Sequence, residues 1–189
     1  MEDSAYGERS YQTTQIDHRY GERVHLLHDP LSLSLLARLC AQETKQPAVS
    51  QLIKHLYRRL VHEVVNQRFP RVIRRVETRM KAVTDKGVFE GALVDPTTPV
   101  VTVDIARAGM LPSQVCFEYL NDVIQSEVVR QDHLIMSRVT DDREQVTGAR
   151  ISGDKVGGEI DGRIVLFPDP MGATGSSLSK AIGYLKENF

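Results

Sequence analysis

Three short runs of largely apolar residues constrain the fold of this chain more than any other feature. They are Val100–Ile105, His133–Val139 and Arg163–Phe167. Such runs are typical of strands that are buried on both faces of a sheet. A loop and a predicted helix follow the first and third runs, with the helices over 113–123 and 178–188. This order predicts an α/β, Rossmann-like fold in which helices flank a central parallel β-sheet.

The segments around these runs add two helices, a hairpin and a flap. Apolar residues recur with helical period over 30–39, and again over a longer helix that spans 47–69. Residues 71–95 alternate instead and contain a turn signal at Asp85–Gly87, which predicts a β-hairpin arm. Residues 140–162 are rich in Gly, Asp, Arg and Glu, and predict a flexible flap or β-arm over a site.

Composition divides the chain at Val24. Residues 1–23 are polar and predict an N-terminal extension, either a flexible arm or a segment lying on a partner subunit, whereas 24–189 form one globular domain. No segment resembles a signal peptide or a membrane span, so we expect a cytoplasmic protein. Cys40 and Cys116 lie among apolar neighbours in predicted helices and are expected to be buried free thiols.

The net charge of −1 means that no global positive field recruits nucleic acid or an anionic membrane. Anionic ligands must therefore be held by local arginines and backbone amides. A cluster of six arginines remains as a candidate basic face, although a solvated helix and hairpin surface accounts for it more simply. These are Arg58, Arg59, Arg68, Arg71, Arg74 and Arg75.

The segment Asp169–Ser177 carries most of the chemistry. A predicted strand delivers the Asp169 carboxylate at its carboxyl end, Gly172 and Gly175 permit tight backbone turns, and a helix begins directly afterwards. The free N–H groups and positive dipole end of that helix then face the same space. The segment can cradle a phosphate monoester, with Asp169 beside the attached sugar.

The same loop allows two other interpretations. A tight strand-to-helix connection capped by Thr174 or Ser176 remains open. Nucleotide-binding P-loops and dinucleotide fingerprints are excluded, because the loop has no Gly-Lys-Ser/Thr and no Gly-x-Gly-x-x-Gly.

The sequence Asp-Pro-Met-Gly-Ala-Thr-Gly-Ser-Ser at 169–177 resembles the Asp-Pro-Met-Leu-Ala-Thr-Gly-Gly-Ser loop of uracil phosphoribosyltransferases. It departs from that pattern at Gly172 and Ser176. Val-Asp-Ile-Ala-Arg-Ala-Gly at 103–109 is similar to the Pro-Ile-Leu-Arg-Ala-Gly segment of the same family, where a cis peptide bond precedes the arginine. Met-Ser-Arg at 136–138 is a looser match to a Tyr-Arg segment, with Arg143 as the competing arginine.

The resemblance implies a type I phosphoribosyltransferase fold and transfer of phosphoribosyl from phosphoribosyl pyrophosphate (PRPP) to uracil, giving UMP. It further implies that Mg²⁺ arrives on the PRPP diphosphate, with no metal ligands from the protein, and that the chain forms a homodimer or higher oligomer. Arg107 and Asp169 are the implied catalytic residues. The implied ligand-binding residues are Arg107, Ala108, Gly109, Arg138, Asp169, Pro170, Met171, Gly172, Ala173, Thr174, Gly175, Ser176 and Ser177.

The resemblance covers about Val24 to Phe189. In the family, further strands and a Gly-Leu-Gly-Asp-type loop that recognises uracil follow the last helix, so the sequence leaves the base-reading segment unidentified. A transferase for another base, or a non-catalytic PRPP- or nucleotide-binding regulator of the same fold, therefore remains an alternative.

The regulator alternative includes binding to RNA, and the charge balance predicts against it. We expect no gel shift of RNA by the chain at physiological salt, because a net charge of −1 provides no electrostatic attraction to the phosphate backbone. A shift that weakens steeply with added salt would instead assign the arginine cluster to RNA.

Overall fold

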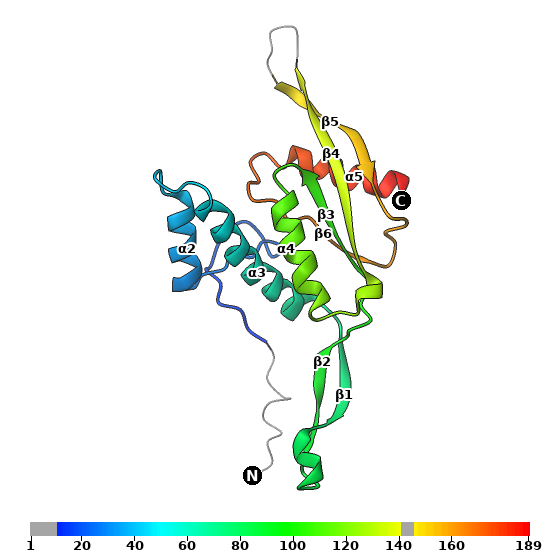
Figure 1. The fold of residues 1–189 in the computed structure, drawn as a ribbon. Coiled ribbons are helices and arrows are strands. Elements are labelled where there is room, and N and C mark those ends of the chain that lie inside the picture. Colours follow the sequence, from blue (N-terminus) through cyan, green and yellow to red (C-terminus); the bar gives the residue numbers. More distant parts are fainter. Residues whose placement is uncertain (1–10, 141–145) are drawn as a thin grey trace.

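A computed structural model describes residues 11–140 and 146–189 of the chain. Figure 1 shows a sheet with helices on both sides and a separate two-stranded arm. The elements in chain order are α2 (Pro30–Cys40), α3 (Ala48–Arg68), β1 (Arg71–Glu77), the 3₁₀ turn η1 (Arg79–Ala82), β2 (Val88–Val94), β3 (Val100–Ala106), α4 (Met110–Asn121), the 3₁₀ turn η2 (Ser126–Val128), β4 (Val129–Thr140), β5 (Val146–Lys155), β6 (Ile164–Leu166) and α5 (Ser176–Asn188).

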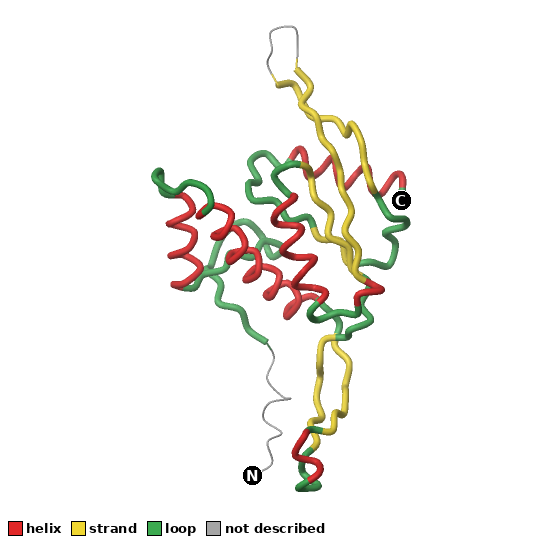
Figure 2. The backbone as a smooth tube through the Cα atoms, in the orientation of Figure 1, coloured by secondary structure: helices red, strands yellow, loops and turns green. Residues whose placement is uncertain are grey.

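The main sheet has four strands in the order β5-β4-β3-β6. Strand β3 pairs in parallel with β4 and with β6, so that Val100 lies opposite both Val129 and Ile164. The predicted parallel core is thus confirmed. Strand β5 adds an antiparallel neighbour, because the chain after β4 folds back along it as a long β-arm (Figure 2).

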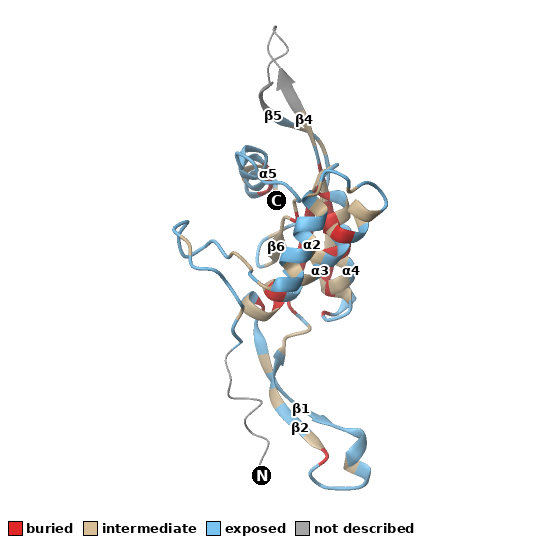
Figure 3. Cartoon of the chain, turned by 90° about the vertical axis from the view of Figure 1, so that its left-hand side faces the viewer, coloured by how far each residue is buried: buried red, intermediate tan, exposed pale blue. Residues whose placement is uncertain are grey.

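Strand β3 is the centre of the hydrophobic core. The side chains of Val100, Val101 and Val103 are fully buried. Val100 packs on one side with Leu120 of α4 and residues of α3, whereas Val101 and Val103 pack on the other side with Leu185 of α5. Figure 3 shows this buried layer between the helices. Burial on both faces explains why the run lacks alternation.

Strand β6 differs from the prediction in one respect. It was expected to be buried, yet its three residues are only half-buried. The reason is its position, since β6 is the edge strand of the described sheet and one of its sides has no neighbouring strand.

The helices begin where the sequence supplies suitable first residues. Asp29 caps α2 by accepting a hydrogen bond from the Ser32 N–H at 2.9 Å, and Pro30 occupies the first turn. Helix α4 begins at Met110, three residues before the predicted start. Pro112 lies in its first turn, where the backbone N–H groups have no partner within the helix, so the missing N–H of proline costs nothing.

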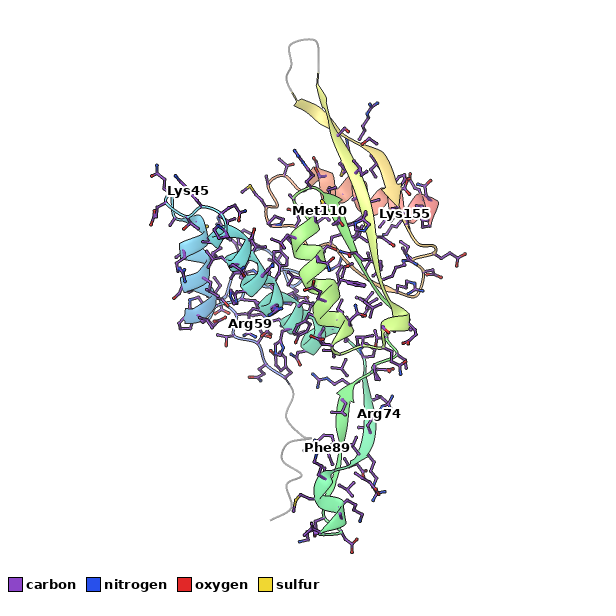
Figure 4. All side chains as sticks on the ribbon, in the orientation of Figure 1. Lys45, Arg59, Arg74, Phe89, Met110 and Lys155 are labelled. Atoms are coloured by element: carbon purple, nitrogen blue, oxygen red, sulfur yellow. The ribbon has the colours of Figure 1, made fainter. Side chains whose placement is uncertain are left out.

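The predicted hairpin is confirmed as β1 and β2. The strands pair antiparallel from Arg71 opposite Val94 to Glu77 opposite Val88. Figure 4 shows Arg74 and Phe89 on this arm, away from the main sheet. Most of its side chains are exposed, so the alternation along the strands does not reflect a buried face in this chain.

The described part of the polar extension packs against its own chain. The Tyr11 hydroxyl donates a 2.7 Å hydrogen bond to Oε2 of Glu63, a buried residue of α3, and Gln15 forms a β-bridge with Leu27. Residues 11–28 are called the strap below, because they lie along α3. The division of the chain into 1–23 and 24–189 stays a prediction.

The two cysteines have different environments. Cys116 of α4 is buried as expected, and burial raises the pKa of its thiol to about 12. The expectation for Cys40 was wrong, because that residue is exposed at the end of α2. Helix α2 has no fully buried residue, since one side packs on α3 and the rest faces outward.

A buried ion pair anchors the chain after β5. Arg130 donates to both carboxylate oxygens of Asp132 at 2.8–3.0 Å, and it also donates to the carbonyl oxygens of Gly158 and Glu159. The Gly157 N–H donates to the same carboxylate at 3.0 Å. The side chain of Asp132 is 1% exposed, so it depends on these partners.

Replacing Arg130 by Met should therefore destabilise the protein strongly. The change leaves the buried Asp132 charge without its cation, which costs about 3–5 kcal/mol of unfolding free energy. Arg75→Met is the matched control, because Arg75 is 63% exposed and 4.0 Å from Glu90. Urea unfolding measures both, and equal stabilities for the two variants would contradict the anchoring role.

Candidate active site

Two loops meet at one edge of the sheet. Arg107–Gly109 connects β3 to α4, and residues 167–175 connect β6 to α5. Because β3 and β6 are parallel neighbours, their carboxyl ends lie at the same edge, and Figure 1 shows the two loops beside each other there. This is where ligands bind in open α/β sheets.

Gly109 is the point of contact between these loops. A Cβ atom at Gly109 would lie 2.9 Å from the backbone N of Ile105 and 3.1 Å from the carbonyl oxygen of Pro168. Both distances are too short for an ordinary contact, so only glycine lets the two backbones approach this closely. The absence of a side chain at Gly109 therefore sets the spacing of the two loops.

The first loop carries an exposed arginine. The peptide bond between Ala106 and Arg107 is cis, which confirms the expectation drawn from the family resemblance. Arg107 itself is exposed, and its carbonyl oxygen accepts from the Met110 N–H at 3.2 Å. The guanidinium group is therefore free of the core and lies at the carboxyl edge of the sheet.

The second loop is turned by Asp169 and closed by a glycine. One carboxylate oxygen of Asp169 accepts from the Met171 N–H at 2.8 Å, which tightens the turn after β6. Gly175 has a φ of 74°, a left-handed conformation that favours glycine. Residues 170–177 are all exposed, so this loop borders open solvent.

The amino end of α5 has no side-chain cap. Gly175 occupies the cap position, and as a glycine it has no side chain that could accept from the first N–H groups. The helix starts at Ser176, two residues before the predicted start. The Thr174 hydroxyl accepts from the Ser176 N–H at a long 3.4 Å. This long contact makes Thr174 a poor cap, so the loop is more than a capped connection between strand and helix. The first N–H groups of α5 face the loop.

The third predicted contact lies on the β-arm. The backbone of Arg138 belongs to β4 and pairs with Ala149 of β5. Its side chain, like the competing Arg143, falls outside the part of the chain whose side chains are described. The role of Arg138 stays a prediction.

Sequence reasoning assigned no role to Tyr57 of α3, yet it lies next to the site. Tyr57 and Asp169 line the same two hollows beside the second loop. Burial raises the pKa of the Tyr57 hydroxyl, and the negative charge of Asp169 raises it further. The sequence alone carried no signal for this pair, since the two residues lie more than a hundred positions apart.

Asp104 is a second group to which the sequence assigned no role. It is 1% exposed on β3, three residues before Arg107, and hydrogen-bonds with Nδ1 of His133 on β4. Its position inside a branched apolar run was visible in the sequence, but the partner became evident only from the parallel register, which places Asp104 opposite His133.

Within the described residues, no three His, Cys, Asp or Glu side chains are arranged to hold a metal ion. Among the same residues, no helix is long and apolar enough to cross a membrane.

Comparison with known proteins agrees with this geometry. A model of the family described as uracil phosphoribosyltransferase matches residues 26–188. The AQ2163 protein from Aquifex aeolicus has a similar structure, with a TM-score of 0.62 and 22% identity over 85% of this chain and 68% of that one. No curated protein matches the chain.

A hypoxanthine phosphoribosyltransferase from Staphylococcus aureus aligns with a TM-score of 0.45 and 13% identity, over 73% of this chain and 57% of that one. The family match and the sheet define a protein with the type I phosphoribosyltransferase fold, as predicted. The chain belongs to the uracil phosphoribosyltransferase family, and it is a phosphoribosyltransferase.

The close approach at Gly109 predicts a specific cost for a methyl group. Gly109→Ala should lower the unfolding free energy by about 1–3 kcal/mol, because the Cβ must push Ile105 and Pro168 apart. Gly172→Ala is the matched control in the second loop, since no atom lies within 4 Å of its Cβ position. Thermal or urea unfolding measures both. Equal stability of the two variants would show that the loops tolerate separation.

Proposed function

We propose that the chain transfers the phosphoribosyl group of PRPP to uracil, giving UMP and pyrophosphate. The observation that carries the proposal is the juxtaposition of Arg107 and the Asp169–Ser177 loop at one sheet edge, together with the uncapped start of α5. The family match supports the same chemistry.

The second loop is suited to the sugar phosphate end of PRPP. Residues Ala173–Ser177 are exposed, carry three hydroxyl groups and lead into the first turn of α5. Backbone N–H groups at a helix start bind a phosphate without a positive side chain. Asp169 stands before them, with one oxygen engaged by Met171 N–H, and its other oxygen accepts from the ribose hydroxyls.

The first loop is suited to the diphosphate end. Arg107 offers paired N–H donors that match phosphate oxygens and keeps its charge at neutral pH. We propose the same diphosphate contact for Arg138, whose backbone belongs to β4. Mg²⁺ enters already bound to the PRPP diphosphate, as part of the substrate, and withdraws charge from the leaving group.

The reaction exchanges one bond at the anomeric carbon of ribose. The bond from that carbon to the pyrophosphate oxygen breaks, and a bond to N1 of uracil forms as N1 loses its proton to solvent. Positive charge develops on the ribose, and Asp169 stabilises it. The flap predicted over residues 140–162, which includes β5, keeps water away from the positively charged ribose.

We also propose that the reaction takes place in the cytoplasm and that the chain works as a homodimer or larger oligomer. The exposed β1–β2 arm supports this, because a long two-stranded arm with little buried surface is stabilised when it packs on another subunit. Nucleic acid and membranes are not proposed as partners.

The proposal is tested by incubating the purified chain with labelled uracil, PRPP and Mg²⁺ and measuring UMP. We expect Arg107→Ala and Asp169→Asn each to lower kcat/KM by about 10²–10³, since each removes a group that stabilises developing charge. Both positions lie outside the core, so urea unfolding should change by less than about 0.5 kcal/mol.

Arg58→Ala on α3 is the control and should retain wild-type turnover. Unchanged turnover in Arg107→Ala would remove that residue from the mechanism. No UMP from the wild-type chain, together with no binding of PRPP, would overturn the proposed function. PRPP binding without turnover would favour a non-catalytic binder instead.

A further inference from the structure

Asp104 is a buried carboxylate at the base of the first loop. It lies on β3, three residues before Arg107, and its side chain is 1% exposed. Its Oδ2 atom accepts a hydrogen bond from Nδ1 of His133, whereas Oδ1 is buried and has no partner among the described residues. This is unusual, because the oxygens of a buried carboxylate are normally satisfied by hydrogen bonds or by a cation.

His133 connects this buried carboxylate to the surface. It lies opposite Asp104 in the parallel register of β3 and β4, and its side chain is 43% exposed. A proton can therefore reach the imidazole from solvent while the carboxylate stays buried. Histidine is the side chain that ordinarily changes its charge between about pH 5 and 8. With the carboxylate ionised, the pair is neutral overall when both ring nitrogens of His133 carry a proton, and it carries one negative charge when only Nδ1 does.

The pair is tied to the first loop through the backbone. The Gly109 N–H donates to the carbonyl oxygen of Ile105 at 3.1 Å, and the Cβ position of Gly109 lies 2.9 Å from the backbone N of Ile105, the atom bonded to Asp104. An extended strand rises about 3.3 Å per residue, so Asp104 lies within about 10 Å of Arg107 along the chain. At that separation, a charge in the protein interior acts on a charged ligand with little screening.

The other charged groups near the pair do not change with pH as a histidine does. On β4 itself, Arg130 and Asp132 are paired with each other, and β6 carries no titratable residue. The remaining elements packed against β3 and β4 carry Cys116, Glu118 and Tyr119 on α4, Glu127 on η2, and Arg150, Asp154 and Lys155 on β5, with Lys155 opposite His133. Side chains of these types ordinarily keep one charge state between about pH 6 and 8, apart from thiols. Cys116 is buried, which raises the pKa of its thiol to about 12.

We propose that Asp104 and His133 form a proton-linked pair that positions the Arg107 loop and sets its affinity for the diphosphate of PRPP. This rests on the proposed function. When His133 takes up a proton from solvent, the imidazolium neutralises Asp104, and the loop presents the charge of Arg107 to the diphosphate. Without that proton, the uncompensated carboxylate opposes the approach of the anionic ligand. Binding of PRPP is therefore linked to protonation of His133.

Two substitutions separate the charges of the pair from its hydrogen bond. His133→Asn keeps an N–H donor close to the position of Nδ1 but takes up no proton, so the pair stays negative at every pH. Asp104→Asn keeps an acceptor for His133 and removes the buried negative charge. Both replacements stay close to the original side chain in size, which limits repacking. His28→Asn is the matched control, since His28 precedes α2 and belongs to neither the sheet nor the two loops.

Binding of PRPP with Mg²⁺ is measured by calorimetry at about pH 6 and about pH 8.5, on either side of the usual histidine range. Each variant is compared with the wild-type chain at the same pH, so that the titration of PRPP itself cancels. We expect His133→Asn to bind PRPP about three- to tenfold more weakly than wild type at the lower pH and equally well at the higher pH. Asp104→Asn should bind about three- to tenfold more tightly than wild type at the higher pH. His28→Asn should match wild type at both.

The outcomes separate this proposal from the proposed function. If the wild-type chain binds PRPP and both variants of the pair match it at each pH, the further inference is overturned and the proposed function stands. The same holds if both variants bind more weakly at both pH values while urea unfolding shows them folded, because the pair is then only structural. If one variant does not fold, the other decides the test, since each predicts a change at a different pH. If the wild-type chain binds no PRPP, the proposed function fails and the role of the pair fails with it.

Discussion

The burial of β3 on both faces is the constraint on which the rest of the structure depends. Its fully buried valines join the core shared with α3 and α4 to the core shared with α5. A strand in that position needs parallel neighbours and helices above and below it. Because β4 and β6 pair with it in parallel, the loops that follow β3 and β6 must lie at the same edge of the sheet. The site is a consequence of that packing.

Close backbone approach then turns two neighbouring loops into one site. Gly109 allows the Arg107 loop to touch the carbonyl of Pro168, one residue before Asp169. Under the proposed function, the Arg107 loop and the loop before α5 hold the two phosphate-bearing ends of PRPP at this spacing. Asp169 and Pro170 of the same turn also line an apolar hollow between α2 and α3.

Much of the fold was predictable because its signals are local. The branched run at Val100–Ile105, the helix period over 47–69 and the Asp85–Gly87 turn each act within a few residues, and all three elements formed where expected. The errors arose where distant packing decides. The exposure of Cys40 and the half-burial of β6 depend on which neighbours lie beside α2 and at the sheet edge, and no local pattern contains that information.

The sequence by itself determined the fold class, the family and the two loops, because short motifs and their positions after strands carry that information. The tertiary structure alone decided what surrounds those loops. It placed Tyr57 beside Asp169, set Asp104 against His133 and laid the strap along α3. Asp104 and His133 lie 29 positions apart in the chain, and Tyr57 and Asp169 lie 112 apart. Only the packing of the folded chain brings such distant residues together.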